Sequence, residues 1–204
     1  MRDRDRLTSV DAYRTAAPVP CVASGARSIG RRSTAAMATH TKPAGDELTS
    51  LAAEAKTARA RITTPKGDIV FTFYPDDAPQ HSAAFIKLAR AGFYDGLAFH
   101  RYEPGFVIQG GDPNGNGSGG PGYNLDAEFN EHPHIKGTVA MARAANPNSA
   151  GSQFYIVLDD APFLNRQYTV FGHVTEGQNV VDQIRAGDPM TAVKIEGGES
   201  SAGG

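Results

Sequence analysis

Polar and apolar residues alternate with a period of two from residue 59 onward, which marks the start of a folded region. Apolar positions alternate with polar ones over 59–63, and the same period returns over 69–74 as Ile-Val-Phe-Thr-Phe-Tyr. Residues 65–68 between them read Pro-Lys-Gly-Asp, a composition typical of a tight turn. Because period two is the pattern of a strand with one buried face, these segments predict a β-hairpin.

Helical spacing of apolar residues occurs at three other places. Over 79–91, Phe85, Leu88 and Ala89 share one helix face, and Gly92 follows as a C-terminal cap. A second helix is predicted over 177–186, and a short one over 47–58 that packs on the domain or frays. Further short strands are predicted near 97–102, 106–110, 137–142, 153–158, 169–174 and 191–196. Many short strands with two covering helices predict a mainly β domain, built as a closed antiparallel barrel.

The length of 204 residues fits one domain with extensions. We expect an unstructured or partly helical N-terminal extension over 1–57, the domain over 58–196, and a flexible C-terminal tail over 197–204. Cys21 is the sole cysteine, which excludes an intramolecular disulfide framework. No run approaches the ~18 apolar residues of a membrane span, so we expect no membrane partner.

Charge is uneven along the chain. Residues 1–41 hold seven Arg and three Asp, a net charge of +4, and the remainder has a net charge of −6. A mildly acidic domain gives no reason to expect nucleic-acid binding. The N-terminal segment fits an organelle transit peptide, a bland extension, or translation that begins at Met37; we expect a cytoplasmic protein, with organelle targeting left open.

Three motifs carry the most information about function. Residues 99–112 read Phe-His-Arg-Tyr-Glu-Pro-Gly-Phe-Val-Ile-Gln-Gly-Gly-Asp, 151–156 read Gly-Ser-Gln-Phe-Tyr-Ile, and 168–172 read Tyr-Thr-Val-Phe-Gly. In this order they resemble the signatures of the cyclophilin family of peptidyl-prolyl cis-trans isomerases, bacterial-type members included. The resemblance covers about 58–196. It implies a closed eight-stranded cyclophilin-like barrel capped by two α-helices, and an enzyme that assists protein folding by rotating X-Pro bonds.

The chemistry of this reaction explains why an arginine matters. An X-Pro bond rotates slowly because amide resonance gives its C–N bond partial double-bond character. In the twisted transition state the proline nitrogen regains a basic lone pair, so a donor aimed at it stabilises the transition state more than the ground state. Arginine is always charged and holds its donors rigidly. We therefore expect no metal and no cofactor.

The resemblance assigns residues to these roles one by one. Arg101 is the expected catalytic donor. The expected substrate-binding residues build an apolar pocket and hold the peptide backbone: His100, Phe106, Val107, Gln109, Ala142, Arg143, Ala144, Gln153, Tyr155, Phe163, Leu164 and Tyr168. Phe163 stands where the most cyclosporin-sensitive members carry Trp, Tyr168 where many carry His, and Arg143 where they carry Asn. The expected partners are proline-containing peptides and unfolded or partly folded proteins, with weak cyclosporin binding and a monomeric state.

Other interpretations stay open on the residues alone. Arg101 beside Glu103 also fits a surface charge, and His100 fits a core histidine as well as a binding one. Strand alternation brings only one of Phe154 and Tyr155 to the pocket, and the resemblance selects Tyr155. The glycine-rich run 115–120 matches G-x-G-x-x-G, but no helical pattern follows it, as a dinucleotide site requires. A non-catalytic proline-peptide binding module on the same fold remains the alternative function.

Overall fold

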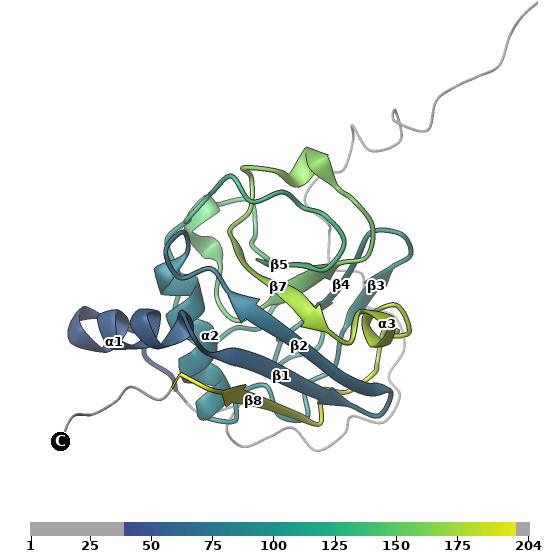
Figure 1. Ribbon diagram of the computed structural model, residues 1–204, viewed down its shortest axis with the longest axis horizontal. Coiled ribbons are helices and arrows are strands. Elements are labelled where there is room, and N and C mark those ends of the chain that lie inside the picture. Colours follow the sequence, from purple (N-terminus) through teal and green to yellow (C-terminus); the bar gives the residue numbers. More distant parts are fainter. Residues whose placement is uncertain (1–38, 199–204) are drawn as a thin grey trace, which may run out of the picture.

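The computed structural model describes residues 39–198, and expectations for residues 1–38 and 199–204, Cys21 and Met37 included, lie outside them. Within this range eight strands form one curled antiparallel sheet (Figure 1). The strands are β1 Arg59–Thr64, β2 Gly67–Phe73, β3 Arg101–Glu103, β4 Val107–Gly110, β5 Thr138–Met141, β6 Phe154–Val157, β7 Val170–Glu176 and β8 Ala192–Glu196. The helices are α1 Gly45–Ala55, α2 Pro79–Arg90 and α3 Gln178–Val181, with 3₁₀ turns η3 Pro147–Ser149 and η4 Pro162–Leu164.

The predicted closure of the barrel was wrong. The strand order is β3-β4-β6-β5-β7-β2-β1-β8, so β3 and β8 are free edges and the sheet is an open, curled half-barrel. The segments before these edge strands do meet, since Phe99 N–H donates to Asp188 O at 2.9 Å and Ala98 forms an isolated bridge with Pro189. Four backbone hydrogen bonds join these segments, among them Met190 N–H to Leu97 O and Gly96 N–H to Met190 O, both at 2.7 Å, but the pairing does not continue into β3 and β8 as a regular ladder.

The predicted hairpin is confirmed. β1 and β2 pair in register from Arg59 opposite Thr72 to Thr64 opposite Gly67. The Thr64 hydroxyl donates to Gly67 O at 2.8 Å and accepts from Lys66 N–H at 3.1 Å. Gly67 has a φ of 128°, which a side chain would strain. The turn residues therefore fix the register that buries the apolar face.

Helix α2 covers one side of the curled sheet and supplies much of the core. Phe85 is fully buried and packs its ring against Phe71, Tyr94 and Phe154. The helix ends as predicted at Gly92, whose φ is 70°. Gly92 N–H donates to Ala89 O and the next N–H donates to Leu88 O, both at 3.0 Å, which is the Schellman pattern.

Helix α1 docks on α2, so the folded body begins well before β1. The helix starts two residues earlier and ends three residues earlier than the predicted 47–58. The Lys87 ammonium lies 2.8 Å from Glu47, and Arg90 pairs with Glu54. Ala55 is buried against the core. The described part of the expected extension therefore includes the predicted short helix, in its packed form.

Helix α3 is shorter than the predicted 177–186. Its residues Val180 and Val181 and the following Ile184 are all buried, as the spacing predicted. The chain loosens after Val181, where Ile184 N–H is shared between Val180 O and Val181 O at 3.2 Å each. The predicted strand near 97–102 is likewise reduced to β3, because residues 97–99 pair only with the irregular segment 187–190.

Candidate active site

A second apolar cluster, separate from the main core, lies on the opposite face of the central strands. Along β6, Phe154 and Ile156 are in the core, whereas Tyr155 and Val157 belong to this outer cluster. The alternation of a strand produces this division, and it places Tyr155 rather than Phe154 in the outer cluster. The outer cluster comprises Val107, Ala140, Tyr155, Val157, Ala161 and Val170, with Tyr74, Phe106, Ala142, Leu164 and Tyr168 packed against it. Six of the predicted site residues therefore meet here.

Strand register places the expected catalytic residue beside this cluster. Arg101 on β3 is paired with Gln109 on β4, which is paired with Tyr155 on β6. Directly opposed residues of antiparallel strands project from the same face, so the three side chains form a row that leads into the outer cluster. The Arg101 guanidinium is 3.4 Å from Gln109 Oε1 and 3.4 Å from Glu103 Oε1. Its side chain keeps 29% of its surface exposed, enough to reach a bound peptide.

The side-chain amide of Gln109 is held in turn by the side-chain amide of Gln153. Gln109 Nε2 donates to Gln153 Oε1 at 2.9 Å. Gln153 Nε2 in turn donates to two carbonyls of the glycine-rich loop, Gly117 O at 2.9 Å and Gly119 O at 2.8 Å. Both ends of the Gln153 amide are thus engaged within the protein. Its predicted contact with a substrate backbone stays a prediction.

An aromatic pair forms one rim of the outer cluster. The rings of Phe106 and Phe163 are stacked with centroids 5.6 Å apart and an interplanar angle of 30°. Phe163 keeps half of its surface exposed. Gln167 Nε2 donates to Phe163 O at 2.7 Å and holds this end of η4 in place. The rim therefore presents an accessible aromatic face next to Leu164.

A buried histidine outside the predicted site residues supports Tyr155. His134 Nδ1 lies 3.2 Å from Asn165 Oδ1, which also accepts the His134 backbone N–H at 2.8 Å. Because that oxygen is an acceptor, Nδ1 carries the proton and Nε2 accepts from the Tyr155 hydroxyl at 3.0 Å. Burial lowers the pKa of His134, partly opposed by the Asn165 contact, and burial raises the pKa of Tyr155 well above its ordinary value. His134 precedes β5 in a loop, and no motif assigned it this role.

Arg143 hydrogen-bonds to the backbone of two loops beside the outer cluster. Its Nε and Nη2 donate to Gln167 O at 3.1 and 2.9 Å, and its Nη1 donates to Ala144 O at 2.9 Å. The guanidinium carbon lies 4.7 Å from the centroid of the Tyr168 ring, a cation–π distance. Ala144 itself is exposed. The Arg143 guanidinium is thus engaged mainly in holding neighbouring loops, and its predicted contact with a substrate stays a prediction.

His100 lies between the core and the site. Its side chain is half-buried, and its Nδ1 has no hydrogen-bond partner among residues 39–198. Burial is the main cause that lowers the pKa of His100; the Asp112 carboxylate opposes this shift, and the Arg101 charge adds to it. A neutral imidazole here fits both a core and a binding role, so both interpretations stand.

Known proteins are similar to this chain in sequence. The family model described as cyclophilin type peptidyl-prolyl cis-trans isomerase/CLD matches residues 59–199. The peptidyl-prolyl cis-trans isomerase of Synechococcus elongatus is 46% identical over 139 residues, covering 67% of this chain and 95% of the relative. The isomerase B of Bacillus subtilis is 50% identical over 131 residues, covering 63% and 91% of the two chains.

Solved structures agree with the sequence relatives. A cyclophilin-type isomerase of Cryptosporidium parvum, solved in the presence of the dipeptide Ala-Pro, has a TM-score of 0.62 and 32% identity. The match covers 68% of this chain and 98% of that one. This chain belongs to the cyclophilin family of peptidyl-prolyl cis-trans isomerases.

Proposed function

We propose that this chain rotates X-Pro peptide bonds with Arg101 as the catalytic donor. The observation that carries the proposal is the row of Arg101, Gln109 and Tyr155 across three strands, which ends in the outer apolar cluster. An arginine beside an apolar surface suits this reaction, because desolvation strengthens its interaction with the lone pair that appears on the proline nitrogen. Named relatives that carry out this activity support the assignment.

The substrate fits the outer cluster as an extended, proline-containing peptide. Phe106 and Leu164, both partly exposed, offer apolar surface for the proline ring, with the buried Val107 in the same cluster, while the guanidinium at the edge of the cluster faces the bond that rotates. Holding the ring still while the carbonyl side turns is a matter of orientation, which needs no covalent step. The Ala-Pro dipeptide present with the Cryptosporidium parvum relative supports this class of ligand.

A non-catalytic proline-peptide binding module on the same fold is the alternative. The two differ in whether bound peptide changes isomer faster than free peptide. Exchange spectroscopy on a labelled Ala-Pro peptide measures both binding and the interconversion rate. We expect the wild-type chain to accelerate interconversion, and Arg101→Ala to bind the peptide while it loses most of the acceleration. A wild-type chain that binds without acceleration is a binding module.

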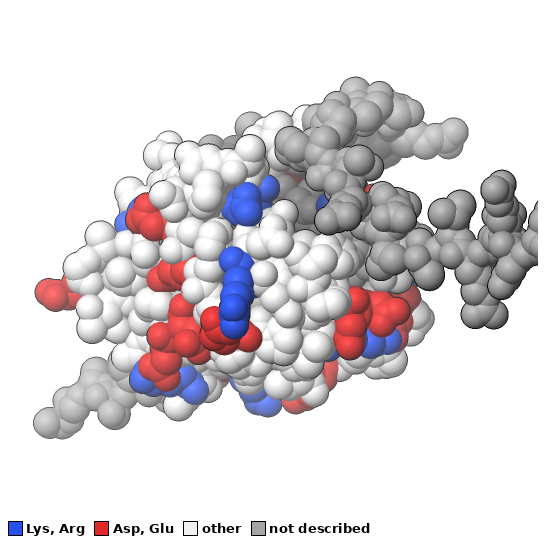
Figure 2. All heavy atoms as spheres, turned by 90° about the horizontal axis from the view of Figure 1, so that it is seen from above, with Lys and Arg blue, Asp and Glu red and all other residues white. Residues whose placement is uncertain are grey.

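The partner expectations extend this proposal. The described residues include no helix long and apolar enough to cross a membrane. On the face drawn in Figure 2, acidic and basic side chains lie near one another rather than in a stripe of one sign. Ion pairs such as Lys136–Asp182 and Lys194–Asp95 likewise mix the two signs among the described residues. This distribution favours soluble peptide partners over nucleic acid. A monomeric, cytoplasmic protein remains our proposal, which sedimentation and localisation of the full-length chain test.

A further inference from the structure

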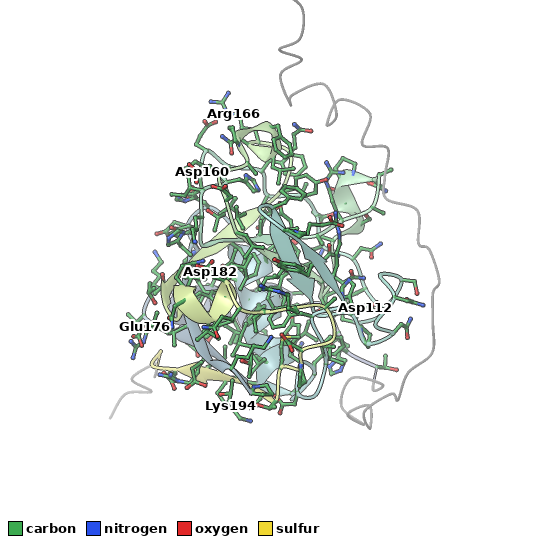
Figure 3. The ribbon with its side chains drawn as sticks, turned by 90° about the vertical axis from the view of Figure 1, so that its right-hand side faces the viewer. Asp112, Asp160, Arg166, Glu176, Asp182 and Lys194 are labelled. Atoms are coloured by element: carbon green, nitrogen blue, oxygen red, sulfur yellow. The ribbon has the colours of Figure 1, made fainter. Side chains whose placement is uncertain are left out.

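The glycine-rich loop 113–119 is organised around one buried carboxylate. Asp112, labelled in Figure 3, is 1% exposed. Its Oδ1 accepts the N–H groups of Asn114 at 2.8 Å and Gly119 at 2.9 Å. Its Oδ2 accepts those of Asn116 at 2.7 Å and Gly117. Four charge-assisted hydrogen bonds from backbone donors thus fold the loop around a single side chain.

This contact explains the G-x-G-x-x-G run without a nucleotide. The backbone donors that would receive a phosphate in such a motif are already paired with Asp112. Glycine is required at 119 for close approach, because a Cβ there would lie 2.1 Å from Asp112 Oδ1. The loop is therefore built to close on its own carboxylate.

The loop fixes the orientation of both amides that lead to Arg101. The carbonyls of Gly117 and Gly119 accept hydrogen bonds and cannot donate them, so the NH₂ group of Gln153 must face the loop. Its Oε1 then faces Gln109 and accepts from Nε2. The Oε1 of Gln109 is left facing the Arg101 guanidinium. Each hydrogen bond thus determines the direction of the next.

We propose that Asp112 is a positioning residue for the isomerisation, acting through loop 113–119, Gln153 and Gln109 on the orientation of Arg101. The proposal rests on the proposed function of Arg101. Asp112 touches no substrate in this scheme. Its carboxylate holds the Gly117 and Gly119 carbonyls where they orient the side-chain amides of Gln153 and Gln109, which we call the amide relay. Small displacements of a catalytic group lower the rate steeply even when the changed residue is remote.

The test compares full-length variants in a prolyl-peptide isomerisation assay. Asp112→Asn keeps the size of the side chain but replaces one acceptor oxygen by a donor, which repels backbone N–H groups. We expect kcat/KM to fall by about 10- to 10²-fold, mainly through kcat, since the loss affects a transition-state contact. Gly119→Ala should give a similar fall by pushing the loop away from an intact carboxylate. The matched control is Asp95→Asn, which removes a carboxylate that accepts the Val193 N–H of β8 at 2.8 Å and no N–H of loop 113–119.

A double-mutant cycle separates positioning from general loss of structure. In an Arg101→Ala background, Asp112→Asn should cost less than about twofold, because the donor that it positions is already gone. A merely structural defect would lower activity by the same factor in both backgrounds and would overturn the proposal, as would a wild-type kcat/KM in Asp112→Asn. Nuclear magnetic resonance gives a readout that needs no activity: the side-chain signals of Gln153, Gln109 and Arg101 should shift in Asp112→Asn and stay in place in Asp95→Asn. If wild type itself lacks isomerase activity, the proposed function fails, while these shifts still report on the relay.

Discussion

Arg101 and Gln109 face each other across β3 and β4, with Arg101 Nη1 3.4 Å from Gln109 Oε1. A separation at the long end of the hydrogen-bond range orients the guanidinium without binding it tightly. The Nε group is similarly 3.4 Å from Glu103 Oε1, on the same strand. Within residues 39–198, Nη2 donates to no protein acceptor, so one donor of the fork remains for a substrate.

Arg101→Lys should therefore lose most of the activity although it keeps the charge. An ammonium is a point donor that cannot serve Gln109 and a proline nitrogen with the fixed geometry of a guanidinium fork. We expect kcat/KM to fall by about 10²-fold for Lys and by about 10²–10³-fold for Ala. The control is Arg59→Ala on β1, which removes an exposed ion pair with Glu176 of β7 and should keep wild-type turnover. Near wild-type activity of a folded Arg101→Lys protein would show that only the charge is needed.

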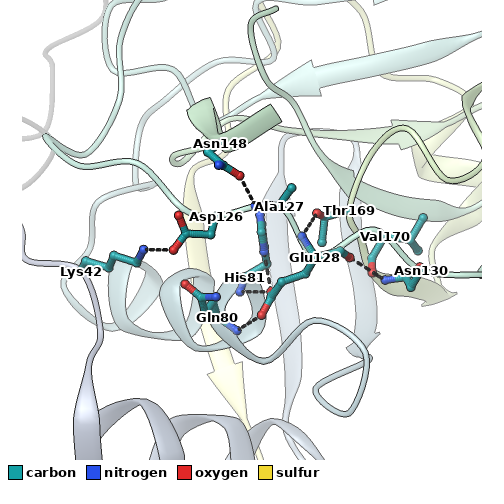
Figure 4. Close-up of polar contacts among 10 residues, drawn as sticks. All are labelled: Lys42, Gln80, His81, Asp126, Ala127, Glu128, Asn130, Asn148, Thr169 and Val170. Atoms are coloured by element: carbon teal, nitrogen blue, oxygen red, sulfur yellow. Dashed lines mark hydrogen bonds and ion pairs between the residues drawn. The ribbon is translucent and has the colours of Figure 1, made fainter. Parts of the chain in front are cut away.

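Glu128 is expected to stabilise the protein by capping α2 from a distant loop (Figure 4). The residue at the N-cap of α2, Ala78, has no capping side chain. Glu128 supplies the acceptors instead: Oε1 takes the Gln80 N–H at 3.0 Å, and Oε2 takes the His81 N–H at 3.1 Å and lies 2.6 Å from His81 Nδ1. An anion at a helix N-terminus is favourable, and a lost cap costs about 0.5–2 kcal/mol.

Glu128→Gln should accordingly lower the free energy of unfolding by about 1–2 kcal/mol, because it removes the charge and one acceptor. Urea denaturation followed by circular dichroism measures the change. Asp126→Asn is the matched control, since Asp126 pairs with Lys42 at 2.8 Å on the exposed side of the same loop. Surface pairs of this kind contribute about 0–1 kcal/mol. Equal losses in both variants would contradict the capping role.

The buried His134 predicts how stability depends on pH. Burial lowers the pKa of His134 in the folded state. Between that value and the unfolded pKa of about 6.5, the unfolded chain binds more protons than the folded one, so the free energy of unfolding falls as pH decreases through this window. Burial lowers the pKa of His173 and of His100 too, so these residues act in the same direction.

Replacing His134 should make the protein less sensitive to acid. The variant His134→Gln loses a titrating group, so the decrease in unfolding free energy from about pH 7 to about pH 5 should become smaller, although stability at neutral pH also falls with the Tyr155 hydrogen bond. Urea titrations at the two pH values measure the slope. An unchanged slope in His134→Gln would mean that the imidazole does not stay neutral in the folded protein.

Local signals determined which parts of the fold were predictable. The β1–β2 hairpin and the Gly92 end of α2 were predicted because period and turn chemistry act over a few residues. Closure was not predictable in this way. It depends on whether segments 96–99 and 187–190, distant in sequence, form a ladder, and in the structure they form only an isolated bridge with a few backbone hydrogen bonds. The sequence period alone carries no information on such a pairing.

The same distinction applies to the candidate site: local motifs indicated some of its residues, and only the folded chain shows the roles of the others. Motif resemblance pointed to Arg101, Gln109 and the apolar residues, and strand register brings them together. The residues that hold them, Asp112 and His134, lie in loops without periodicity. Their roles arise from contacts that only the folded chain makes, such as the Tyr155 hydroxyl on His134 Nε2. The glycine-rich run was visible in the sequence, but its interpretation needed the buried carboxylate.

The exposed ring of Phe163 is expected to set the response to cyclosporin. It stacks on Phe106 at the rim and is half exposed, so a larger ring fits there without displacing the core. Trp adds an indole N–H donor and more apolar surface than Phe. A hydrogen bond contributes about 0.5–1.5 kcal/mol, the extra apolar area adds to it, and about 1.4 kcal/mol corresponds to one decade in affinity. We therefore expect Phe163→Trp to bind cyclosporin about one to two decades more tightly than the wild-type chain.

Peptide turnover should change much less, since Phe106 and Leu164 provide the surface for the proline ring. Inhibition constants and kcat/KM measured on both proteins test the two expectations together. Equal inhibition constants would show that Phe163 does not determine cyclosporin affinity, and would point to Tyr168 or to Arg143, whose guanidinium lies over the Tyr168 ring.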